Sequence, residues 1–391
     1  MKAHRFVLAA GGTGGHVFPA ISLAEVLTKK GHEVLYITDP RGAGLQPVDK
    51  TWTVECVPAA TLSVQGLLPK LKALWCLLRS VLHARRLLKN FDAGIIVGFG
   101  GYPTVAPVLA AFINRHIIII HEQNAIVGRA NRWLSRIATV MATSFESTVG
   151  AEITDLEIIR TGNPVRSEMI NARATPYPSL DGNSPINILV IGGSLGAKVL
   201  SQVVPEAILL LPDDLRKNII ITQQCREDDI AMVKSTYAKA KQKSEIRVFF
   251  ENISEKIRDA HLVISRSGAS TIAELSVVGR PAIFVPYKFA VDDHQHINAN
   301  SMVKVGGAWS FREVELNSKI LAKFLKAILS DPRKLTTAAN VAYHCGVPNS
   351  AENLADFLND LIEQNTPQLQ CAAFKENRLK ENRARISKVE K

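Results

Sequence analysis

Short apolar runs alternate with longer amphipathic stretches along most of the chain. The runs are rich in Val and Ile, and their hydrophobicity is continuous rather than alternating, which is typical of strands covered on both faces in a parallel α/β sheet. We therefore predict a strand at each run, joined by helices to the next. The predicted strands are FVLAA, EVLYIT, AGIIVGF, HIIIIHE and ATVMATS in the first half, and INILVIGG, NIIITQQ, IRVFF, HLVISRS and PAIFVPY in the second.

The two halves repeat one arrangement. A strand leads into GGTGGH at residues 11–16, and another leads into GGSLGA at residues 192–197. Each is a strand, a glycine-rich turn and a helix start, which together can hold a phosphate group. We expect two doubly wound α/β domains facing each other across a cleft that holds the active site. The expected domains are 1–163 and 164–345, followed by a closing helix at 346–366 and a basic, disordered tail at 367–391.

Composition narrows the class of protein. The 391 residues are 47% hydrophobic and 21% charged, which excludes a largely disordered chain. Five scattered cysteines without a C-x-x-C pair exclude a disulfide framework and a structural zinc site, so reduced thiols are expected. The apolar start leads into glycines rather than a cleavage site, and no run reaches the roughly 18 apolar residues of a membrane span. We expect a soluble or peripherally attached protein without a signal peptide.

The net charge of +11 indicates an anionic partner. Residues 66–91 combine an apolar stripe at helical spacing with a fringe of Lys and Arg and no acid, which favours binding to an anionic membrane. A helix packed on the core is the alternative. Binding to nucleic acid explains the positive charge less well, because no recognisable nucleic-acid-binding module is present. The basic residues are Lys70, Lys72, Arg79, Arg85, Arg86 and Lys89, and the stripe is Leu67, Leu68, Leu71, Leu74, Trp75, Leu78, Val81 and Leu82.

His16 directly follows the first glycine turn. An imidazole at a helix start facing the cleft suits a general base, although a capping or merely exposed histidine is the alternative. A dinucleotide-binding oxidoreductase is the obvious competitor, since Asp39 closes the second strand. Its G-x-G-x-x-G frame, started at Gly12, requires glycine where this chain has Val17. Asp39 is therefore expected to be a loop residue.

Further polar candidates follow later strands. His121, Glu122 and Asn124 come after a very apolar strand and suit sugar hydroxyls, unless they satisfy only the backbone of their loop. Glu274 follows the small residues of SRSGASTIAE, where its carboxylate could bridge the two hydroxyls of a ribose or simply stabilise a helix start. The segment 291–300, VDDHQHINAN, could chelate a metal, but its side chains diverge at a helix start, so sugar hydrogen bonding is favoured.

Seven motifs occur in order: GGTGGHVFPA, GFGGYPTVAP, HEQNAIVGRAN, TGNPVR, GGSLGA, SRSGASTIAE and DDHQHINAN. Together they resemble glycosyltransferase family 28, over nearly the whole chain up to about residue 365. The resemblance implies a GT-B fold. It also implies inverting transfer of N-acetylglucosamine from UDP-GlcNAc to the 4-hydroxyl of undecaprenyl-diphosphate-linked N-acetylmuramoyl-pentapeptide. This step of peptidoglycan synthesis would take place at the cytoplasmic face of the bacterial inner membrane, with other cell-wall synthesis proteins as possible partners.

The resemblance also implies the site. His16 is the expected base and Glu122 the alternative, while the helix after GGSLGA, with Ser194 and Arg166, would stabilise the leaving diphosphate without a metal or cofactor. The rival readings are another UDP-sugar enzyme of this architecture, such as a 2-epimerase, and a non-catalytic sugar-nucleotide or lipid-binding protein. The residues implied to bind UDP-GlcNAc are Thr13, Gly14, Gly15, Asn124, Arg166, Ser194, Phe250, Glu274 and Gln295.

Overall fold

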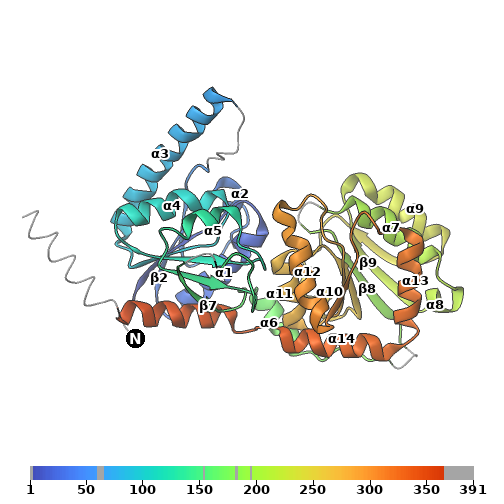
Figure 1. Ribbon diagram of the computed structural model, residues 1–391. Helices are drawn as coiled ribbons and strands as arrows, with labels where there is room; N and C mark the ends of the chain where they lie inside the picture. The colour runs from blue at the N-terminus through green and yellow to red at the C-terminus, as the bar shows by residue number, and fades with distance from the viewer. Residues whose placement is uncertain (1–2, 60–65, 153–154, 181–183, 194–195, 365–391) are drawn as a thin grey trace, which may run out of the picture.

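Two parallel β-sheets, each sandwiched between helices, make up the computed structural model (Figure 1). The structure describes residues 3–59, 66–152, 155–180, 184–193 and 196–364; the tail predicted at 367–391 lies outside them. Continuous apolar strands need cover on both faces, and the helices supply it. Both sheets have the doubly wound strand order, so the predicted fold class is confirmed.

The first sheet has the order β3-β2-β1-β4-β5-β6-β7. Alternate residues of β1 enter opposite cores, with Phe6 and Leu8 facing α1 and Val7 and Ala9 facing α3 and α4. The strands are β1 (Arg5–Ala9), β2 (Glu33–Thr38), β3 (Thr53–Cys56), β4 (Ile95–Gly98), β5 (Ile117–Glu122), β6 (Val140–Thr143) and β7 (Glu157–Arg160). The helices are α1 (Gly14–Lys29), α2 (Pro40–Ala43), α3 (Leu67–Phe91), α4 (Tyr102–Ile113) and α5 (Arg129–Leu134).

The second sheet has the order β10-β9-β8-β11-β12-β13 and the same winding. Its strands are β8 (Ile186–Ile191), β9 (Ile219–Gln224), β10 (Lys243–Arg247), β11 (Leu262–Ser265), β12 (Ala282–Phe284) and β13 (Ala308–Ser310). Its helices are α6 (Ser167–Arg173), α7 (Lys198–Leu209), α8 (Asp213–Lys217), α9 (Ile230–Lys239), α10 (Ile253–Arg258), α11 (Ala269–Val278), α12 (His294–Val305), α13 (Ser318–Leu329) and α14 (Pro332–Cys345), with 3-10 turns η1 (Glu227–Asp229) and η2 (Val291–Asp293).

Nine of the ten predicted strands are confirmed, and the tenth is misplaced. IRVFF was predicted to be a strand, but β10 ends at Arg247, and Val248 and Phe249 are exposed beyond it. Three strands, β3, β7 and β13, were not predicted. All four deviations lie at the edges of the two sheets, where one side of the strand has no neighbour.

The chain passes twice between the two domains. Met169 of α6 packs in the core of the second domain, whereas Leu358, in the helix over residues 350–364, returns to the core of the first. Figure 1 shows this last helix, in red, beneath the first sheet. The two crossing segments are bonded to each other, because the Ser350 hydroxyl donates to the Asn163 carbonyl at 2.9 Å.

Candidate active site

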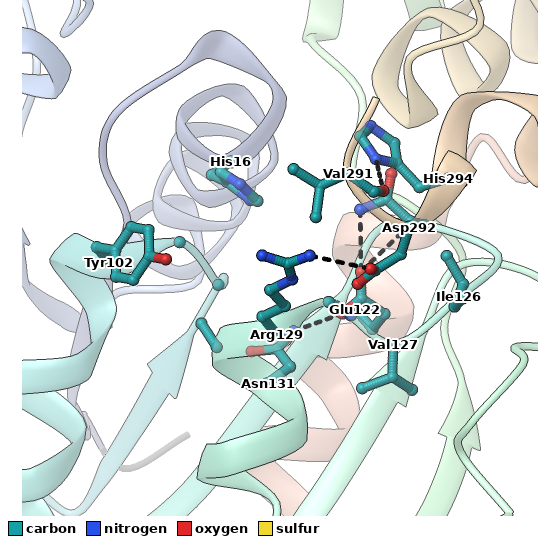
Figure 2. A pocket seen from close by; sticks show the side chains of 15 residues that line it. His16, Tyr102, Glu122, Ile126, Val127, Arg129, Asn131, Val291, Asp292 and His294 are labelled. Atoms are coloured by element: carbon teal, nitrogen blue, oxygen red, sulfur yellow. Dashed lines mark hydrogen bonds and ion pairs between the residues drawn. The ribbon is translucent and has the colours of Figure 1, made fainter. Parts of the chain in front are cut away.

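A pocket lies between the two domains, at the carboxyl ends of the strands of the first sheet (Figure 2). The first turn of α1, the loop after β4 and the segment from Glu122 to Asn131 line one side, and η2 and the first residue of α12 in the second domain line the other. Ligands of doubly wound sheets collect at this position. The pocket is lined by His16, residues 100–102, Glu122, Asn124, residues 126–131, Val291, Asp292 and His294.

Asp39 stabilises the first glycine turn by hydrogen bonding. One carboxylate oxygen of Asp39 accepts hydrogen bonds from the backbone N–H groups of Gly12, at 2.9 Å, and Gly42, at 3.0 Å. Burial opposes ionisation, but these two bonds and Arg41 hold the pKa of the Asp39 carboxyl below its usual value. Gly12 has φ of +82°, so glycine is needed there. Asp39 is therefore a loop residue between β2 and α2, as expected, and its hydrogen bond to Gly12 stabilises the first glycine turn.

His16 is the third residue of α1 and faces the pocket (Figure 2). Its Nδ1 lies 3.1 Å from Oε1 of Gln123. Its ring rests against the turn after β4, where Gly100 and Gly101 have φ of +81° and +74°. A Cβ atom on Gly101 would come within 3.3 Å of the ring, so the glycines of GFGGYPTVAP leave room for the imidazole.

Both carboxylate oxygens of Glu122 accept hydrogen bonds from the segment that follows it. Oε1 accepts from the backbone and side-chain nitrogens of Asn124, at 3.0 and 3.1 Å. Oε2 accepts from the Gly128 backbone at 2.9 Å and from Nδ2 of Asn131 at 2.8 Å. Four donors surround a carboxylate that is 2% exposed, which leaves little access for a substrate proton. The geometry thus favours His16 over Glu122 as the base.

Gln123 was predicted only as one of the two HEQN amides suited to sugar hydroxyls, and not as a partner of His16. It is 2% exposed and links His16 to His121. Burial lowers the pKa of the His121 imidazole to about 4, so that ring is neutral at physiological pH. The polar run after an apolar strand was the available signal, but the direction of each side chain was not readable from it.

Asn124 lies at the boundary between the domains. Its Oδ1 accepts from Nδ2 of Asn298 at 3.1 Å, and Oδ1 of Asn298 accepts from the backbone N–H of Ala125 at 2.8 Å. Asn298 is fully buried; it was predicted only as part of segment 291–300, where sugar hydrogen bonding was favoured, and not as a contact between the domains. A second contact joins the first glycine turn to α11, since the Ser270 hydroxyl donates to the Gly15 carbonyl at 3.3 Å.

The expected ribose acid, Glu274, is paired with Arg166. Nε and Nη2 of Arg166 both bond to Oε1 of Glu274, at 3.0 and 2.9 Å. Burial raises the pKa of the Glu274 carboxyl, and Arg166 counteracts this. The guanidinium also lies 5.0 Å from the ring centre of Phe18, against which Gly14 packs. Through Phe18, the structure thus connects three residues of the expected donor site: Gly14 of the first turn, Arg166, and Glu274 of α11.

The remaining predicted donor residues are more dispersed. Thr13 is the exposed N-cap residue of α1, and its side chain makes no capping bond. Oε1 of Gln295 accepts from the backbone N–H of Tyr287 at 2.9 Å. Phe250 is buried after β10, with Lys256 Nζ 5.9 Å from its ring centre. Ser194 lies outside the described residues.

The acids and histidines of segment 291–300 bind separate partners. Asp292 pairs with Arg129 at 3.2 Å, Asp293 pairs with Arg312 at 2.9 Å, and His294 bonds to a backbone carbonyl. Within the part of the chain that the structure describes, no cluster of three or more His, Cys, Asp or Glu side chains is placed to hold a metal ion.

Comparison with known proteins identifies the class. The family model for the glycosyltransferase family 28 N-terminal domain matches residues 6–143, and that for the C-terminal domain matches residues 187–358. The chain belongs to glycosyltransferase family 28 and has the GT-B fold. This confirms the resemblance seen in the seven motifs.

Individual relatives are more specific. The chain is 44% identical to UDP-N-acetylglucosamine--N-acetylmuramyl-(pentapeptide) pyrophosphoryl-undecaprenol N-acetylglucosamine transferase of Rhodospirillum centenum, over 91% of this chain and 94% of that one. Identity to the enzyme of the same name from Novosphingobium aromaticivorans is 40%, over 91% and 92%. The crystal structure of Acinetobacter baumannii MurG matches with a TM-score of 0.74 and 28% identity, over 91% and 99%. A putative UDP-N-acetylglucosamine 2-epimerase of Listeria monocytogenes, 14% identical with a TM-score of 0.68, shares the fold.

Proposed function

We propose that this protein transfers N-acetylglucosamine from UDP-GlcNAc to the 4-hydroxyl of an undecaprenyl-diphosphate-linked N-acetylmuramoyl-pentapeptide, a step of peptidoglycan synthesis. The observation that carries the proposal is the identity of 40–44% to transferases of that name over 91% of the chain. The pocket between the domains supports it, because His16 and Asn124 line that pocket from the first domain, opposite Asp292 and His294 of the second.

The reaction is a single inverting displacement. The acceptor oxygen attacks the anomeric carbon, the bond from that carbon to the diphosphate breaks, and the electron pair leaves with UDP. His16 takes the hydroxyl proton, which general-base catalysis makes worth roughly 10²–10⁴ in rate. Backbone N–H groups at the start of α7 and the guanidinium of Arg166 stabilise the charge that develops on the diphosphate.

Glu274 can hold the ribose without releasing Arg166. Both bonds from Arg166 go to Oε1, and no described residue donates to Oε2. Oε2 is therefore available to accept from a ribose hydroxyl, while Oε1 stays bonded to Arg166. In this arrangement Glu274 binds the ribose, and Arg166, its ion-pair partner, binds the diphosphate.

We also propose that the protein binds an anionic membrane surface through α3 and acts from the cytoplasmic face of the inner membrane. Figure 1 shows α3 projecting from the first domain. Seven of its eight predicted stripe residues are between 47% and 80% exposed, whereas Val81 is packed in the core at 7%. No helix in the described ranges is long and apolar enough to cross a bilayer. Exposed leucines and a tryptophan beside lysines suit the interface of an anionic bilayer.

Product analysis tests the proposed reaction. The purified protein is mixed with UDP-GlcNAc and a lipid-linked muramyl-pentapeptide in detergent micelles. A β-linked disaccharide on the lipid, together with one equivalent of UDP, is the expected result. UDP-N-acetylmannosamine formed without acceptor would indicate the 2-epimerase alternative instead. Tight UDP-GlcNAc binding with no turnover would indicate a binding protein.

A further inference from the structure

Gln123 lies between two imidazoles and bonds to both. Its Oε1 is 3.1 Å from Nδ1 of His16, and its Nε2 is 3.0 Å from Nδ1 of His121. On the other edge of the His121 ring, Nε2 is 3.0 Å from the carbonyl oxygen of Gly162. The chain of contacts runs from the pocket through the first domain to the segment that leads to the second.

The amide of Gln123 can point in one direction only. Its Nε2 also donates to the backbone carbonyl of His121, at 3.2 Å. Exchanging nitrogen and oxygen would place two acceptor oxygens at that distance, which is unfavourable for buried groups. Oε1 therefore faces His16. Because an amide oxygen only accepts, Nδ1 of His16 must carry the hydrogen.

His121 agrees with this direction. The Gly162 carbonyl only accepts, so Nε2 of His121 carries the hydrogen and Nδ1 presents a lone pair to the Gln123 amide. His121 is completely buried and stays neutral near pH 7, which keeps its Nδ1 an acceptor. Every contact in the chain is thus satisfied in one arrangement of hydrogens.

The remaining nitrogen of His16 is the one that reacts. With the hydrogen on Nδ1, the lone pair is on Nε2, and none of the described residues hydrogen-bonds to Nε2. The edge of the ring that carries Nε2 lies beside Gly101, at the wall of the pocket. A neutral imidazole with its lone pair on Nε2 can accept a proton from a substrate hydroxyl there.

We propose that Gln123 is a positioning residue that fixes His16 in the tautomer with hydrogen on Nδ1, so that Nε2 is the base toward the acceptor hydroxyl. This inference rests on the proposed transfer reaction. A neutral amide orients the ring without adding a charge beside it, in contrast to the carboxylate that orients histidine in many hydrolases. The other titratable groups that face the pocket are Tyr102, Glu122, Arg129, Asp292 and His294.

Nitrogen-15 NMR of histidine-labelled protein tests the tautomer without any turnover. The His16 signals are assigned by their loss in His16→Gln. We expect neutral His16 to show a protonated, pyrrole-type Nδ1 and an unprotonated, pyridine-type Nε2. A pyridine-type Nδ1 in the wild type would overturn the proposal, whether or not the protein transfers sugar. Failure of the product assay with the expected spectrum would instead count against the proposed function alone.

Kinetics test the consequence. Gln123→Met should lower kcat about 10- to 100-fold, with KM for UDP-GlcNAc within about twofold, and should give a mixture of His16 tautomers. Gln123→Glu should move the acid limb of the kcat/KM profile upward by about one pH unit or more, because a carboxylate favours the imidazolium. The matched control is Gln223→Met, which removes a buried amide bonded to Tyr237 in the second domain. It should leave the profile and the His16 spectrum unchanged.

Two results would overturn the positioning role. One is a folded Gln123→Met with wild-type kcat and a wild-type His16 spectrum. The other is a Gln123→Glu profile that coincides with that of the wild type. Should both variants fail to fold, the wild-type spectrum still decides the question.

Discussion

Asn124 and Asn298 form a side-chain hydrogen bond of 3.1 Å between the two domains. The Asn298 side chain also accepts a hydrogen bond from the backbone N–H of Ala125, at 2.8 Å, and donates one to the Ser267 carbonyl, at 3.3 Å. The loop after β5, which begins at Gln123, is therefore hydrogen-bonded to α12 and to the turn before α11 of the second domain. Asn124 was predicted as a sugar ligand, and its position at this contact means that a bound sugar would sit directly against the domain boundary.

We predict that Asn298→Ala weakens the connection between the domains. The change leaves the Ala125 N–H and the Ser267 carbonyl without a protein partner, which should cost about 1–3 kcal/mol of unfolding free energy. Calorimetry should show a lower Tm and less overlap between the unfolding of the two domains. Asn300→Ala is the control, since its amide bonds to His296 within α12. Equal Tm values for the two variants would contradict this role.

The acid sensitivity of the protein should depend on His121. Its pKa is about 4 in the folded protein and about 6.5 when unfolded. Between these values the unfolded chain holds a proton that the folded protein lacks, so the free energy of unfolding falls as pH falls from 6.5 to 4, by about 3 kcal/mol at most. Urea unfolding across this range should show a smaller fall for His121→Gln. Parallel curves for variant and wild type would refute the assignment.

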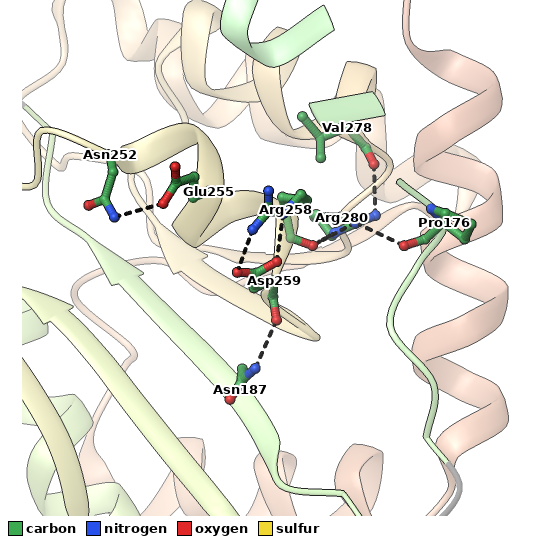
Figure 3. Close-up of polar contacts among 8 residues, drawn as sticks. All are labelled: Pro176, Asn187, Asn252, Glu255, Arg258, Asp259, Val278 and Arg280. Atoms are coloured by element: carbon green, nitrogen blue, oxygen red, sulfur yellow. Dashed lines mark hydrogen bonds and ion pairs between the residues drawn. The ribbon is translucent and has the colours of Figure 1, made fainter. Parts of the chain in front are cut away.

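Arg280 is a buried cation bonded entirely to carbonyl groups (Figure 3). It donates to the carbonyls of Arg258 and Val278, at the ends of α10 and α11, and to that of Pro176 in the connecting segment. Burial lowers the pKa of its guanidinium to about 10, so it remains charged at neutral pH. These bonds offset the cost of burying the charge and satisfy three helix-end or loop acceptors.

Arg280→Met should therefore destabilise the second domain by roughly 2–5 kcal/mol, because several buried carbonyls lose their donor. Arg258→Met is a suitable control, since that side chain pairs with Asp259 at the surface and its backbone carbonyl is retained. It should cost less than about 1 kcal/mol. Urea unfolding measures both values. A loss below 1 kcal/mol for Arg280→Met would show that water replaces the guanidinium without penalty.

Membrane binding through α3 separates into an apolar part and an electrostatic part. Leu71→Ser with Trp75→Ser should weaken sedimentation with neutral and anionic vesicles alike, because exposed apolar area is lost. Lys70→Glu with Lys72→Glu should weaken sedimentation with anionic vesicles alone, by at least about tenfold at low salt. Arg85 is less suitable for substitution, since its Nε donates to Asn114 of the first domain. Unchanged partitioning of both double variants would rule out α3 as the contact.

The interior of the fold was predictable from the sequence, and its edges were not. Central strands such as β5 are buried on both faces and therefore read as unbroken apolar runs. An edge strand is half exposed, so β7, EIIR, keeps Glu157 and Arg160 at its ends and shows no such run. β10 was misplaced for the same reason, because the apolar residues Val248 and Phe249 follow the strand rather than form it.

The site was predictable as a set of loops but not as a set of contacts. The glycine turn before His16 and the polar run HEQN that contains Glu122 both follow predicted strands, and they identified the site because the carboxyl ends of parallel strands meet at one edge of a sheet. The pairing of Arg166 with Glu274 joins residues 108 positions apart, and no local pattern encodes it. The contacts of Gln123 with His16 and of Asn298 with Asn124 were not predicted for that reason, since these partners lie in distant segments.

The most direct test of the proposed mechanism is His16→Ala assayed for both transfer and donor binding. We predict that kcat falls by roughly 10²–10⁴ while the Kd for UDP-GlcNAc changes by less than about twofold, because His16 acts on the acceptor proton and not on the nucleotide. His16→Ala that transfers sugar at the wild-type rate would contradict it.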